Sequence, residues 1–435
     1  MDDAALAALD RYAQDVLETG TATALALAVT DHERTLAVRS FGDAGDSTLF
    51  QIGSVGKSFT AILVLQLAEQ GRLDLHAPVT DVLPWFSVQT AHRPITLHDL
   101  LTHTAGLISG SEIATGSNFD VVELAGSETA YAPGEHLWYS NVAYRVIGWA
   151  LETATGQGYP QLVRERILQP LEMGESEPWI VQEMRPRMAP AMLPAFDDRP
   201  WRPQHGLVPA TWIDSAEADG CVCCSAGDLA VYLRALMTGD PRLLSEQSWR
   251  LMRTAHVADD QDDEPGARYG YGLAFRSDGW GHGGGMVGNV TSMWTDGGGL
   301  GAVAVLSGID GTASLVDAAL ALGRGRSPAP FAPEQAEPVV DDGSCPPDWR
   351  AYLGHYRGHC AWLTNFRVVG REGGLWYGSD HISSDRQPLA PLGDGSFRLG
   401  EQEWSPERMR FDTVVDGVAQ RAWRSGAAYH RTFTP

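Results

Sequence analysis

Residues 54–70 constrain the fold more than any other segment, because they predict a helix that is apolar around its whole circumference. The consecutive residues Leu63, Val64 and Leu65 point about 100° apart on such a helix, so no face is left for solvent. Gly71 then provides a typical helix C-cap. A helix of this kind must be buried, with other elements of a larger globular fold covering all of its sides.

The elements predicted around this helix are of both types. Helices are expected over residues 4–18, 141–155, 159–168, 226–237, 245–253 and 312–322, and strands over 24–30, 35–41, 269–275, 289–295 and 302–307. The strands fall at both ends of this stretch, and most of the helices lie between them. That order predicts an α+β domain over residues 1–325.

The composition and the hydrophobic pattern of the sequence change beyond residue 325. Residues 326–346 are rich in proline, glycine and acidic side chains, which predicts a linker. Short strand-like runs follow at residues 363–369, 375–378, 396–399, 408–413 and 420–424, separated by glycine-containing turns. Residues 347–435 are therefore expected to form a small antiparallel β-barrel.

The net charge of −23 argues against two classes of function. A strongly acidic chain repels phosphate backbones and anionic membrane surfaces, so no nucleic-acid partner is expected. No stretch approaches the roughly 20 apolar residues that a transmembrane helix needs, so no membrane insertion is expected either. The first residues lack the basic start and apolar centre of a secretory signal, and we expect a cytoplasmic protein.

The five cysteines do not indicate a disulfide framework in a chain of 435 residues. Cys221, Cys223 and Cys224 lie together, but no histidine pair or second cysteine pair completes a set of metal ligands. We interpret this cluster as small buried hydrophobic side chains. The sequence thus predicts no metal site, no metal dependence and no cofactor.

Lysine occurs once, at residue 57, whereas the other 31 of the 32 lysine and arginine residues are arginine. Arginine stays protonated at any useful pH, but burial lowers the pKa of a lysine, which can then become neutral and accept a proton. Ser54 precedes Lys57 by three residues, which places the two side chains on one face of the predicted helix. Ser54 also begins that helix, where free N–H groups and the helix dipole favour an oxyanion. The pair is therefore a candidate nucleophile and base.

A second candidate motif is the run of Tyr139, Ser140 and Asn141. The Tyr139 phenol can relay a proton if a neighbouring cation lowers its pKa. Asn141 offers both an acceptor and a donor for a substrate amide. The structural alternative is a tyrosine that precedes a helix capped by asparagine.

The third motif, residues 281–285, reads Gly-His-Gly-Gly-Gly, and its glycines would let a strand edge approach a bound acyl group closely. A similar run forms the oxyanion loop of lipases, but the chain has no Gly-x-Ser-x-Gly elbow. Gly283, Gly285 and Gly288 match the dinucleotide-binding pattern, but no strand is predicted before them, and a strand rather than a helix is predicted after them. We reject both of these interpretations.

Taken in order, these motifs resemble those of the penicillin-recognising serine hydrolases, which include class C β-lactamases, D-Ala-D-Ala carboxypeptidases, D-aminopeptidases and related esterases. The motifs are Ser54-Val55-Gly56-Lys57, Tyr139-Ser140-Asn141 and His282-Gly283-Gly284, with family landmarks at residues 95–107, 132–134 and 225–229. The resemblance covers about residues 5–325. It implies a β-lactamase-like fold, an antiparallel sheet flanked by helices plus an all-helical part. Residues from 353 onward look like the lipocalin-like β-barrel that some members carry.

The resemblance also implies roles for the matching residues. Ser54 is then the nucleophile, Lys57 the base and Tyr139 the acid/base that relays the proton. The implied substrate-binding residues are Asn141, His282, Gly284 and Gly285. The implied oxyanion hole consists of the backbone N–H groups of Ser54 and Gly285.

Two positions modify this picture. Family members that bind a free carboxylate usually carry threonine or serine where this chain has Gly283, which argues against recognition of β-lactams and free C-terminal carboxylates. His103 belongs to the first landmark, which is structural in the family, so we expect no chemical role for it.

Three functions remain open from the sequence. The chain could hydrolyse amide, ester or thioester bonds of small-molecule or peptidyl substrates. It could instead pass the acyl group to an amine, as the branch that releases and cyclises nonribosomal peptides does, with a carrier-protein-bound peptide as substrate. It could also be a catalytically silent binding or scaffold protein, although the intact Ser54, Lys57 and Tyr139 argue against that.

Overall fold

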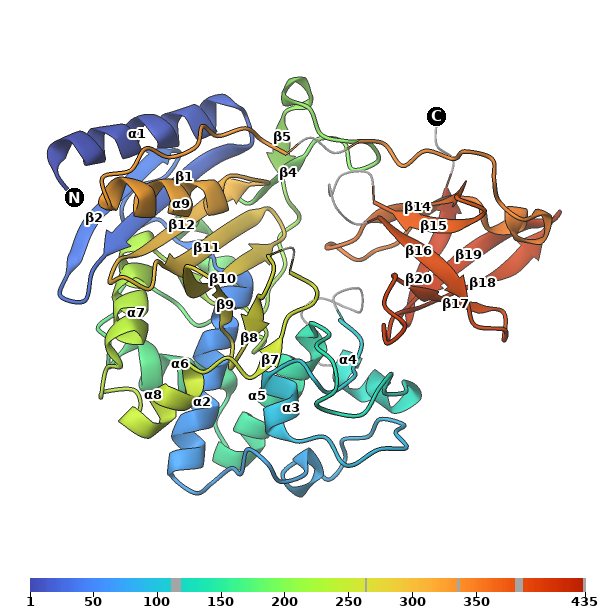
Figure 1. Ribbon diagram of the computed structural model, residues 1–435, viewed down its shortest axis with the longest axis horizontal. Coiled ribbons are helices and arrows are strands. Elements are labelled where there is room, and N and C mark those ends of the chain that lie inside the picture. The colour runs from blue at the N-terminus through green and yellow to red at the C-terminus, as the bar shows by residue number, and fades with distance from the viewer. Residues whose placement is uncertain (111–118, 263, 335–336, 380–385, 433–435) are drawn as a thin grey trace.

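The computed structural model describes residues 1–110, 119–262, 264–334, 337–379 and 386–432. Figure 1 shows a larger part, with a central sheet and helices, and a smaller part that is a β-barrel. In the part of the chain that is described, no helix is both long and apolar enough to cross a membrane.

An antiparallel sheet of eight strands forms the centre of the larger part, in the order β2-β1-β12-β11-β10-β9-β8-β7. These strands are β1 (Ala22–Thr30), β2 (Thr35–Gly42), β7 (Val257–Ala258), β8 (Arg268–Tyr269), β9 (Ala274–Arg276), β10 (Gly279–Met286), β11 (Asn289–Thr295) and β12 (Gly301–Gly308). Two small sheets pair β3 (Phe50–Gln51) with β6 (Cys223–Cys224) and β4 (Met192–Pro194) with β5 (Leu207–Pro209). Strand β1 pairs with β12, which confirms that the strands predicted at the two ends of this stretch belong to one sheet.

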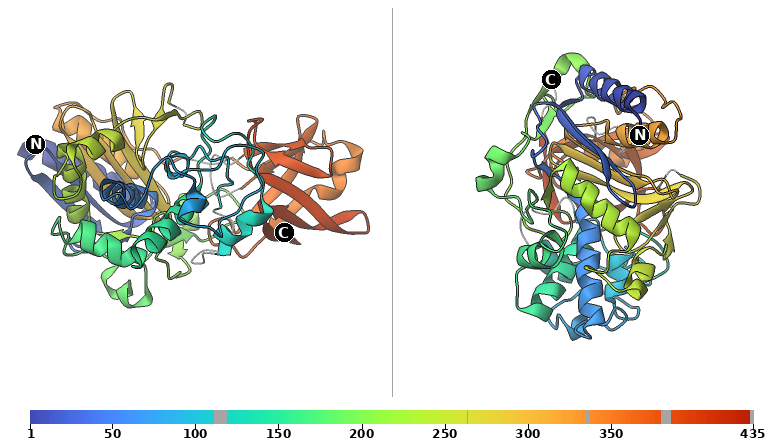
Figure 2. Two further views of the ribbon diagram at one scale, coloured as in Figure 1. Left: turned by 90° about the horizontal axis from the view of Figure 1, so that it is seen from below. Right: turned by 90° about the vertical axis from the view of Figure 1, so that its left-hand side faces the viewer.

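Both faces of the sheet are buried. Along β1 the even-numbered residues from Ala24 to Ala28 belong to the core that contains α2 (Gly56–Glu69), because successive side chains alternate across a strand. The odd-numbered residues from Leu25 to Val29 belong to the core beneath α1 (Asp3–Glu18) and α9 (Thr312–Gly323). The side view in Figure 2 shows α1 and α9 on one face and α2 with α7 (Ala226–Thr238) on the other.

Helix α2 confirms the prediction of a buried helix, since every residue from Gly56 to Leu67 is buried. A 3-10 turn, Gly53–Val55, precedes it and contains Ser54. The other α-helices are α3 (Leu97–Leu101), α4 (Phe119–Glu123), α5 (Asn141–Thr155), α6 (Tyr159–Val163) and α8 (Glu246–Met252). The short 3-10 helices are Val79–Asp81, Leu124–Gly126, Gln182–Arg187, Pro203–His205 and Pro347–Tyr352, and a π-helical turn, Arg164–Leu168, continues α6.

Two strand predictions in this part need correction. The run at 269–275 is not one strand but β8 and β9 joined by a tight turn. That turn contains Gly272, which has a φ of +67° and lies so close to α2 that a Cβ there would be 2.7 Å from the carbonyl of Lys57. The glycine-rich run at 281–285, before which we predicted no strand, is itself part of strand β10. Strand β11 follows it as predicted, so the dinucleotide-binding interpretation stays rejected.

The smaller part is a closed antiparallel barrel, as predicted. Its strands are β13 (Gly354–Arg357), β14 (Asn365–Arg371), β15 (Gly374–Gly378), β16 (Arg386–Pro391), β17 (Ser396–Leu399), β18 (Arg408–Val415), β19 (Val418–Arg424) and β20 (Ala427–Thr432). The predicted runs correspond to β14, β15, β17, β18 and β19, whereas β13, β16 and β20 were missed. Strand β16 contains two prolines, which count against a strand, and β13 and β20 are short and polar and pair with each other to close the barrel.

Aromatic side chains fill the barrel. Tyr356, Phe366, Tyr377 and Tyr429 are fully buried, and the ring centroid of Phe366 lies 5.0 Å from that of Tyr377 and 4.8 Å from that of Tyr429. The barrel is therefore a packed core. The described residues of the predicted linker at 326–346, from which 335–336 are left out, contain neither helix nor strand.

Candidate active site

Ser54 and Lys57 lie next to each other at the start of α2, as their spacing predicts. The distance between Lys57 Nζ and Ser54 Oγ is 3.0 Å. Lys57 is completely buried, whereas Ser54 is partly exposed. Two carbonyl oxygens also accept hydrogen bonds from Lys57 Nζ, namely Oδ1 of Asn141 at 2.7 Å and the backbone oxygen of Asp219 at 2.6 Å.

These contacts determine the direction in which the lone pair of a neutral Lys57 points. A neutral amine has two N–H groups and one lone pair, and the carbonyl oxygens of Asn141 and Asp219 can only accept. They therefore take the two N–H groups, and the lone pair faces Ser54, whose hydroxyl has a proton to give. Burial lowers the pKa of Lys57 from 10.5 to about 8, although the Asp219 carboxylate opposes this shift. The predicted direction of the Lys57 pKa is confirmed.

Tyr139 lies beside Lys57, with Nζ 4.9 Å from the centroid of the phenol ring. Burial raises the pKa of Tyr139 above its usual value, and its interaction with Ser54 opposes this only in part. The Tyr139 hydroxyl is close to Ser54 but lacks the geometry of a full hydrogen bond. Proton relay by Tyr139 was expected on the condition that a neighbouring cation lowers this pKa, and that condition is not met, because loss of water around the phenolate raises the pKa instead. Tyr139 is thus a protonated phenol.

His103 holds the segment that carries Tyr139. The backbone oxygen of His103 accepts a hydrogen bond of 2.8 Å from the N–H of Trp138, and its Nδ1 accepts one of 3.0 Å from the N–H of Ser140. Because Nδ1 accepts, Nε2 carries the proton of a neutral ring. Burial holds the pKa of His103 well below its usual 6.5. This geometry agrees with the structural role that we expect for His103.

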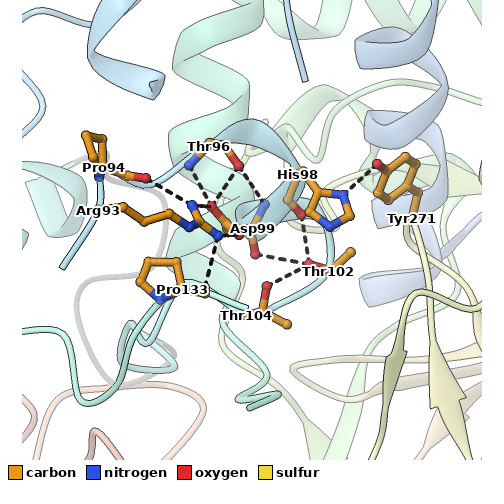
Figure 3. Close-up of polar contacts among 9 residues, drawn as sticks. All are labelled: Arg93, Pro94, Thr96, His98, Asp99, Thr102, Thr104, Pro133 and Tyr271. Atoms are coloured by element: carbon orange, nitrogen blue, oxygen red, sulfur yellow. Dashed lines mark hydrogen bonds and ion pairs between the residues drawn. The ribbon is translucent and has the colours of Figure 1, made fainter. Parts of the chain in front are cut away.

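Two family landmarks meet around the buried carboxylate of Asp99 (Figure 3). Arg93 donates to both Asp99 oxygens, at 2.7 and 2.8 Å, and to the backbone oxygen of Pro133 at 2.9 Å. Thr96 and Asp99 form a capping box at the start of α3. Burial raises the pKa of Asp99, but the hydrogen bonds from Arg93 and Thr96 lower it more, so the carboxylate stays ionised. This network links the two landmarks.

His282 is buried on β10, with 6% of its surface exposed. Its Nδ1 contacts the carbonyl oxygen of Gly283, and its Nε2 lies 2.9 Å from the hydroxyl of Tyr269. Because a carbonyl only accepts, Nδ1 carries the proton and Nε2 accepts from Tyr269. Burial lowers the pKa of His282 to about 4, so the ring is neutral near pH 7.

The backbone atoms of the implied oxyanion hole lie where the turn Gly53–Val55 meets β10. A Cβ on Gly53, whose φ is +53°, would lie 2.7 Å from the nitrogen of Gly285, so only glycine fits. A Cβ on Gly284 would lie 3.2 Å from the nitrogen of Ser54. Strand β9 pairs with β10 at residues 279–281, and the following residues of β10 run past Ser54. The structure therefore brings Gly284 and Gly285 together with the candidate nucleophile.

A cavity of about 180 Å³ lies in front of Ser54. Its lining includes Asn141 and two charged side chains that the sequence analysis missed, Arg145 and Asp219. Arg145 Nε is 3.2 Å from Asp219 Oδ2, and the two side chains are 6% and 13% exposed. Asp219 Oδ1 is buried and makes no hydrogen bond to any residue that the structure describes. The position of Arg145, four residues after Asn141 on one helix, could have indicated it, whereas no local pattern marks Asp219.

The cavity continues into a groove of about 680 Å³. Five residues line both: Thr211, Gly285, Met286, Val287 and Trp362. Trp362 belongs to the loop between β13 and β14, so the barrel contributes to the wall of the site. Thr211 of the larger part and Trp362 of the barrel therefore both line the cleft.

The cysteine cluster is buried, as predicted, and Cys221 lines the small cavity. Its Sγ lies 2.8 Å from Oγ of Ser215, and burial raises the pKa of Cys221 to about 12, so it remains a thiol. Among the residues that the structure describes, no group of three or more histidine, cysteine, aspartate or glutamate side chains is arranged to hold a metal ion.

Comparison with known proteins identifies the family. The model of the family described as Beta-lactamase matches residues 9–323. The chain belongs to the beta-lactamase family. The resemblance inferred from the three motifs is thereby confirmed, together with the fold that it implied for the larger part.

Two curated relatives match this beta-lactamase family member over part of their length. Penicillin-binding protein 4 of Amycolatopsis lactamdurans is 31% identical over 249 residues, which are 54% of this chain and 62% of that protein. Protein flp of Staphylococcus aureus strain MW2 is 33% identical over 139 residues, which are 30% of this chain and 28% of that protein. The chain thus spans less than two thirds of the length of either relative.

Solved structures of similar fold cover both parts of the chain. The octameric penicillin-binding protein homologue from Pyrococcus abyssi aligns over 99% of this chain and 100% of its own, with a TM-score of 0.66 and 19% identity. SurE aligns over 98% and 99%, with a TM-score of 0.61 and 21% identity. A D-stereospecific amidohydrolase from Streptomyces sp. aligns over 69% and 94%, with a TM-score of 0.59 and 25% identity. The first two show that the barrel is part of a fold seen elsewhere.

Proposed function

We propose that this beta-lactamase family member is a serine acyl-enzyme catalyst that cleaves an amide, ester or thioester bond of a peptide-like substrate. One observation carries the proposal: Lys57 Nζ lies 3.0 Å from Ser54 Oγ while two carbonyl oxygens accept its N–H groups. A neutral amine placed in this way is oriented to take the proton of Ser54.

The proposed reaction has two stages. Ser54 Oγ attacks the substrate carbonyl carbon and its proton passes to Lys57 Nζ, while the backbone N–H groups of Ser54 and Gly285 hold the oxyanion. When the tetrahedral intermediate collapses, the bond to the leaving group breaks, and a proton from Lys57 reaches that group through the Tyr139 hydroxyl. Water then attacks the acyl-Ser54 ester, releases the acid and restores Ser54.

The groove supports an acyl group of peptide size. Its volume of about 680 Å³ exceeds the roughly 300 Å³ at which drug-sized ligand sites begin. Its walls are largely apolar and include Leu193, Trp201, Val208, Val290 and Ile309. An extended chain with apolar side chains would fit there while its reacting carbonyl enters the small cavity at Ser54.

The test combines covalent labelling with turnover. A fluorophosphonate should label the protein at Ser54, and a peptidyl thioester or ester should be consumed faster than a penicillin, with product masses read directly. Ser54→Ala should abolish labelling and turnover, whereas Ser47→Ala, which changes an exposed serine, should keep both. A protein with neither label nor turnover would be the catalytically silent alternative, and the proposal would fail.

A second candidate function is transfer of the acyl group to an amine, and Asp219 favours it. Asp219 lines the cavity at Ser54, and its buried Oδ1 makes no hydrogen bond to the described residues, so its carboxylate can accept a hydrogen bond from the N–H of a neutral attacking amine. The substrate would then be a peptidyl thioester, in the cell a carrier-protein-bound peptide, and the product an amide or a cyclic peptide.

The product ratio from one peptidyl thioester separates the two functions. Asp219→Asn keeps the backbone oxygen that contacts Lys57 but removes the carboxylate charge, so it should lower the ratio of amine-coupled to hydrolysed product. Free acid as the sole product of the unchanged protein would exclude the second function.

A further inference from the structure

A carboxylate from the barrel reaches the segment that precedes α5. Glu407 lies between β17 and β18 and is 2% exposed. Its Oε1 accepts a hydrogen bond of 2.6 Å from the backbone N–H of Ser109 and one of 3.2 Å from Nε1 of Trp138. Its Oε2 accepts a hydrogen bond from the hydroxyl of Ser425, a residue of the barrel. Both carboxylate oxygens are therefore engaged, one of them with the larger part of the chain.

Each of the two donors on the larger part is connected directly to a proposed site residue, one through a hydrogen bond and the other through the chain. The backbone oxygen of Ser109 accepts hydrogen bonds from the N–H of Asn141 at 2.8 Å and from that of Val142 at 3.2 Å. Trp138 directly precedes Tyr139 in the chain. A single oxygen of Glu407 thus anchors the chain near both Tyr139 and Asn141.

We infer that Glu407 is a positioning residue: from the barrel, it holds Tyr139 and Asn141 in place against Lys57. The inference rests on the proposed function, since Glu407 gains this role only if those residues take part in the reaction. A buried carboxylate suits the task because hydrogen bonds to a charged acceptor are shorter and stronger than those to a neutral one. The donors of Ser109 and Trp138 would be left unsatisfied without it.

Two other contacts also join the barrel to the larger part. The ring of Trp404 stacks on that of His136, with centroids 4.1 Å apart and planes at 9°. Arg357 Nη1 lies 2.6 Å from Oδ2 of Asp197. Loss of Glu407 should therefore release the Tyr139 segment without detaching the barrel, and Arg357→Gln is a matched control that weakens docking elsewhere.

The first experiment compares steady-state kinetics of the full chain for one peptidyl ester. Glu407→Ala should lower kcat about 10- to 100-fold, as expected when catalytic groups are displaced slightly, with a much smaller change in KM. Glu407→Gln should stay within a few-fold of the unchanged protein, because its amide oxygen can still accept from Ser109 and Trp138. Arg357→Gln should leave kcat unchanged.

The second experiment does not depend on activity. Backbone hydrogen exchange at Ser109 and Asn141 should be faster in Glu407→Ala than in Glu407→Gln, under conditions where circular dichroism shows both to be folded. If Glu407→Ala does not fold, Trp138→Phe removes one donor while it keeps an aromatic ring, and it should show the same two effects, reduced in size.

Two results would overturn the inference. One is a folded Glu407→Ala protein with unchanged kcat and unchanged exchange, and the other is an equal loss of kcat in Arg357→Gln. Absence of turnover and of Ser54 labelling in the unchanged protein would instead refute the proposed function, so the two failures can be told apart.

Discussion

The backbone oxygen of Asp219 accepts a hydrogen bond of 2.6 Å from Nζ of Lys57, which lies 162 positions earlier in the chain. This bond, together with the one from Lys57 to Asn141, leaves the lone pair of a neutral Lys57 directed at Ser54. The chemistry that we propose depends on this direction, because a base must face the proton that it removes.

Replacing Lys57 by arginine should be nearly as damaging as replacing it by alanine. Both variants should lose on the order of 10²–10⁴-fold in kcat/KM, since a guanidinium keeps its charge and cannot accept a proton. Ester turnover measured on protein of verified thermal stability provides the comparison. An arginine variant with more than about a tenth of normal activity would mean that Lys57 acts through its charge.

The pH dependence of kcat/KM should report the neutral form of Lys57. Because burial lowers the pKa of Lys57 to about 8, activity should rise with pH, with a midpoint near that value, and fall about tenfold per unit below it. Burial lowers the pKa of His282 to about 4, so this histidine should add no step between pH 5 and 8. A profile with a midpoint near 6.5 would point to a histidine base instead.

Removing the hydroxyl of Tyr139 should slow the reaction most when the leaving group is poor. Tyr139→Phe should lower turnover of a peptide amide more than that of a thioester, because a thiolate leaves without protonation. Tyr131→Phe removes another buried hydroxyl and should leave the amide-to-thioester ratio unchanged. Equal losses on the two substrates would argue against proton relay by Tyr139.

Residue 283 has room for an added Cβ and is the position at which a hydroxyl can be introduced. A Cβ on Gly283 would meet no described atom within 4 Å, and the position is exposed. Gly283→Thr should therefore raise the rate of acylation by benzylpenicillin several-fold over Gly283→Ala, which adds a methyl group but no hydroxyl. Rapid acylation of the unchanged protein by penicillin would contradict our view that Gly283 disfavours carboxylate recognition.

The close approach of Gly53 to Gly285 leaves no room for a side chain at residue 53, so Gly53→Ala should destabilise the protein. Gly53→Ala combines a left-handed φ, which costs a non-glycine residue roughly 1–2 kcal/mol, with a Cβ 2.5 Å from the oxygen of Gly285. Gly71→Ala carries the same φ penalty but meets no described atom within 4 Å. Thermal unfolding should show the larger loss in Gly53→Ala, and Ser54 labelling should slow in that variant alone.

Local sequence patterns predicted an element correctly where residues close in the chain determine its bounds. Helix α5 begins and ends where predicted because Ser140 caps its start and Gly156 adopts the left-handed conformation after its end. The glycine turn inside residues 269–275 was missed because its cause, the approach to Lys57, lies more than 200 residues away in the sequence. Strands β13 and β20 were missed for a similar reason, since each is defined by pairing with the other.

The sequence by itself determined the Ser54–Lys57 pair and the burial of its helix, because a spacing of three residues on an all-apolar helix fixes both. Only the tertiary structure decided which way the amine of Lys57 points and that burial raises rather than lowers the pKa of Tyr139. It also decided that Trp362 of the barrel lines the cavity at Ser54 and that Glu407 of the barrel bonds to the segment before α5. The physical reason is range: helix periodicity acts between neighbours in the chain, whereas desolvation and long-range hydrogen bonds exist only after distant segments have packed together.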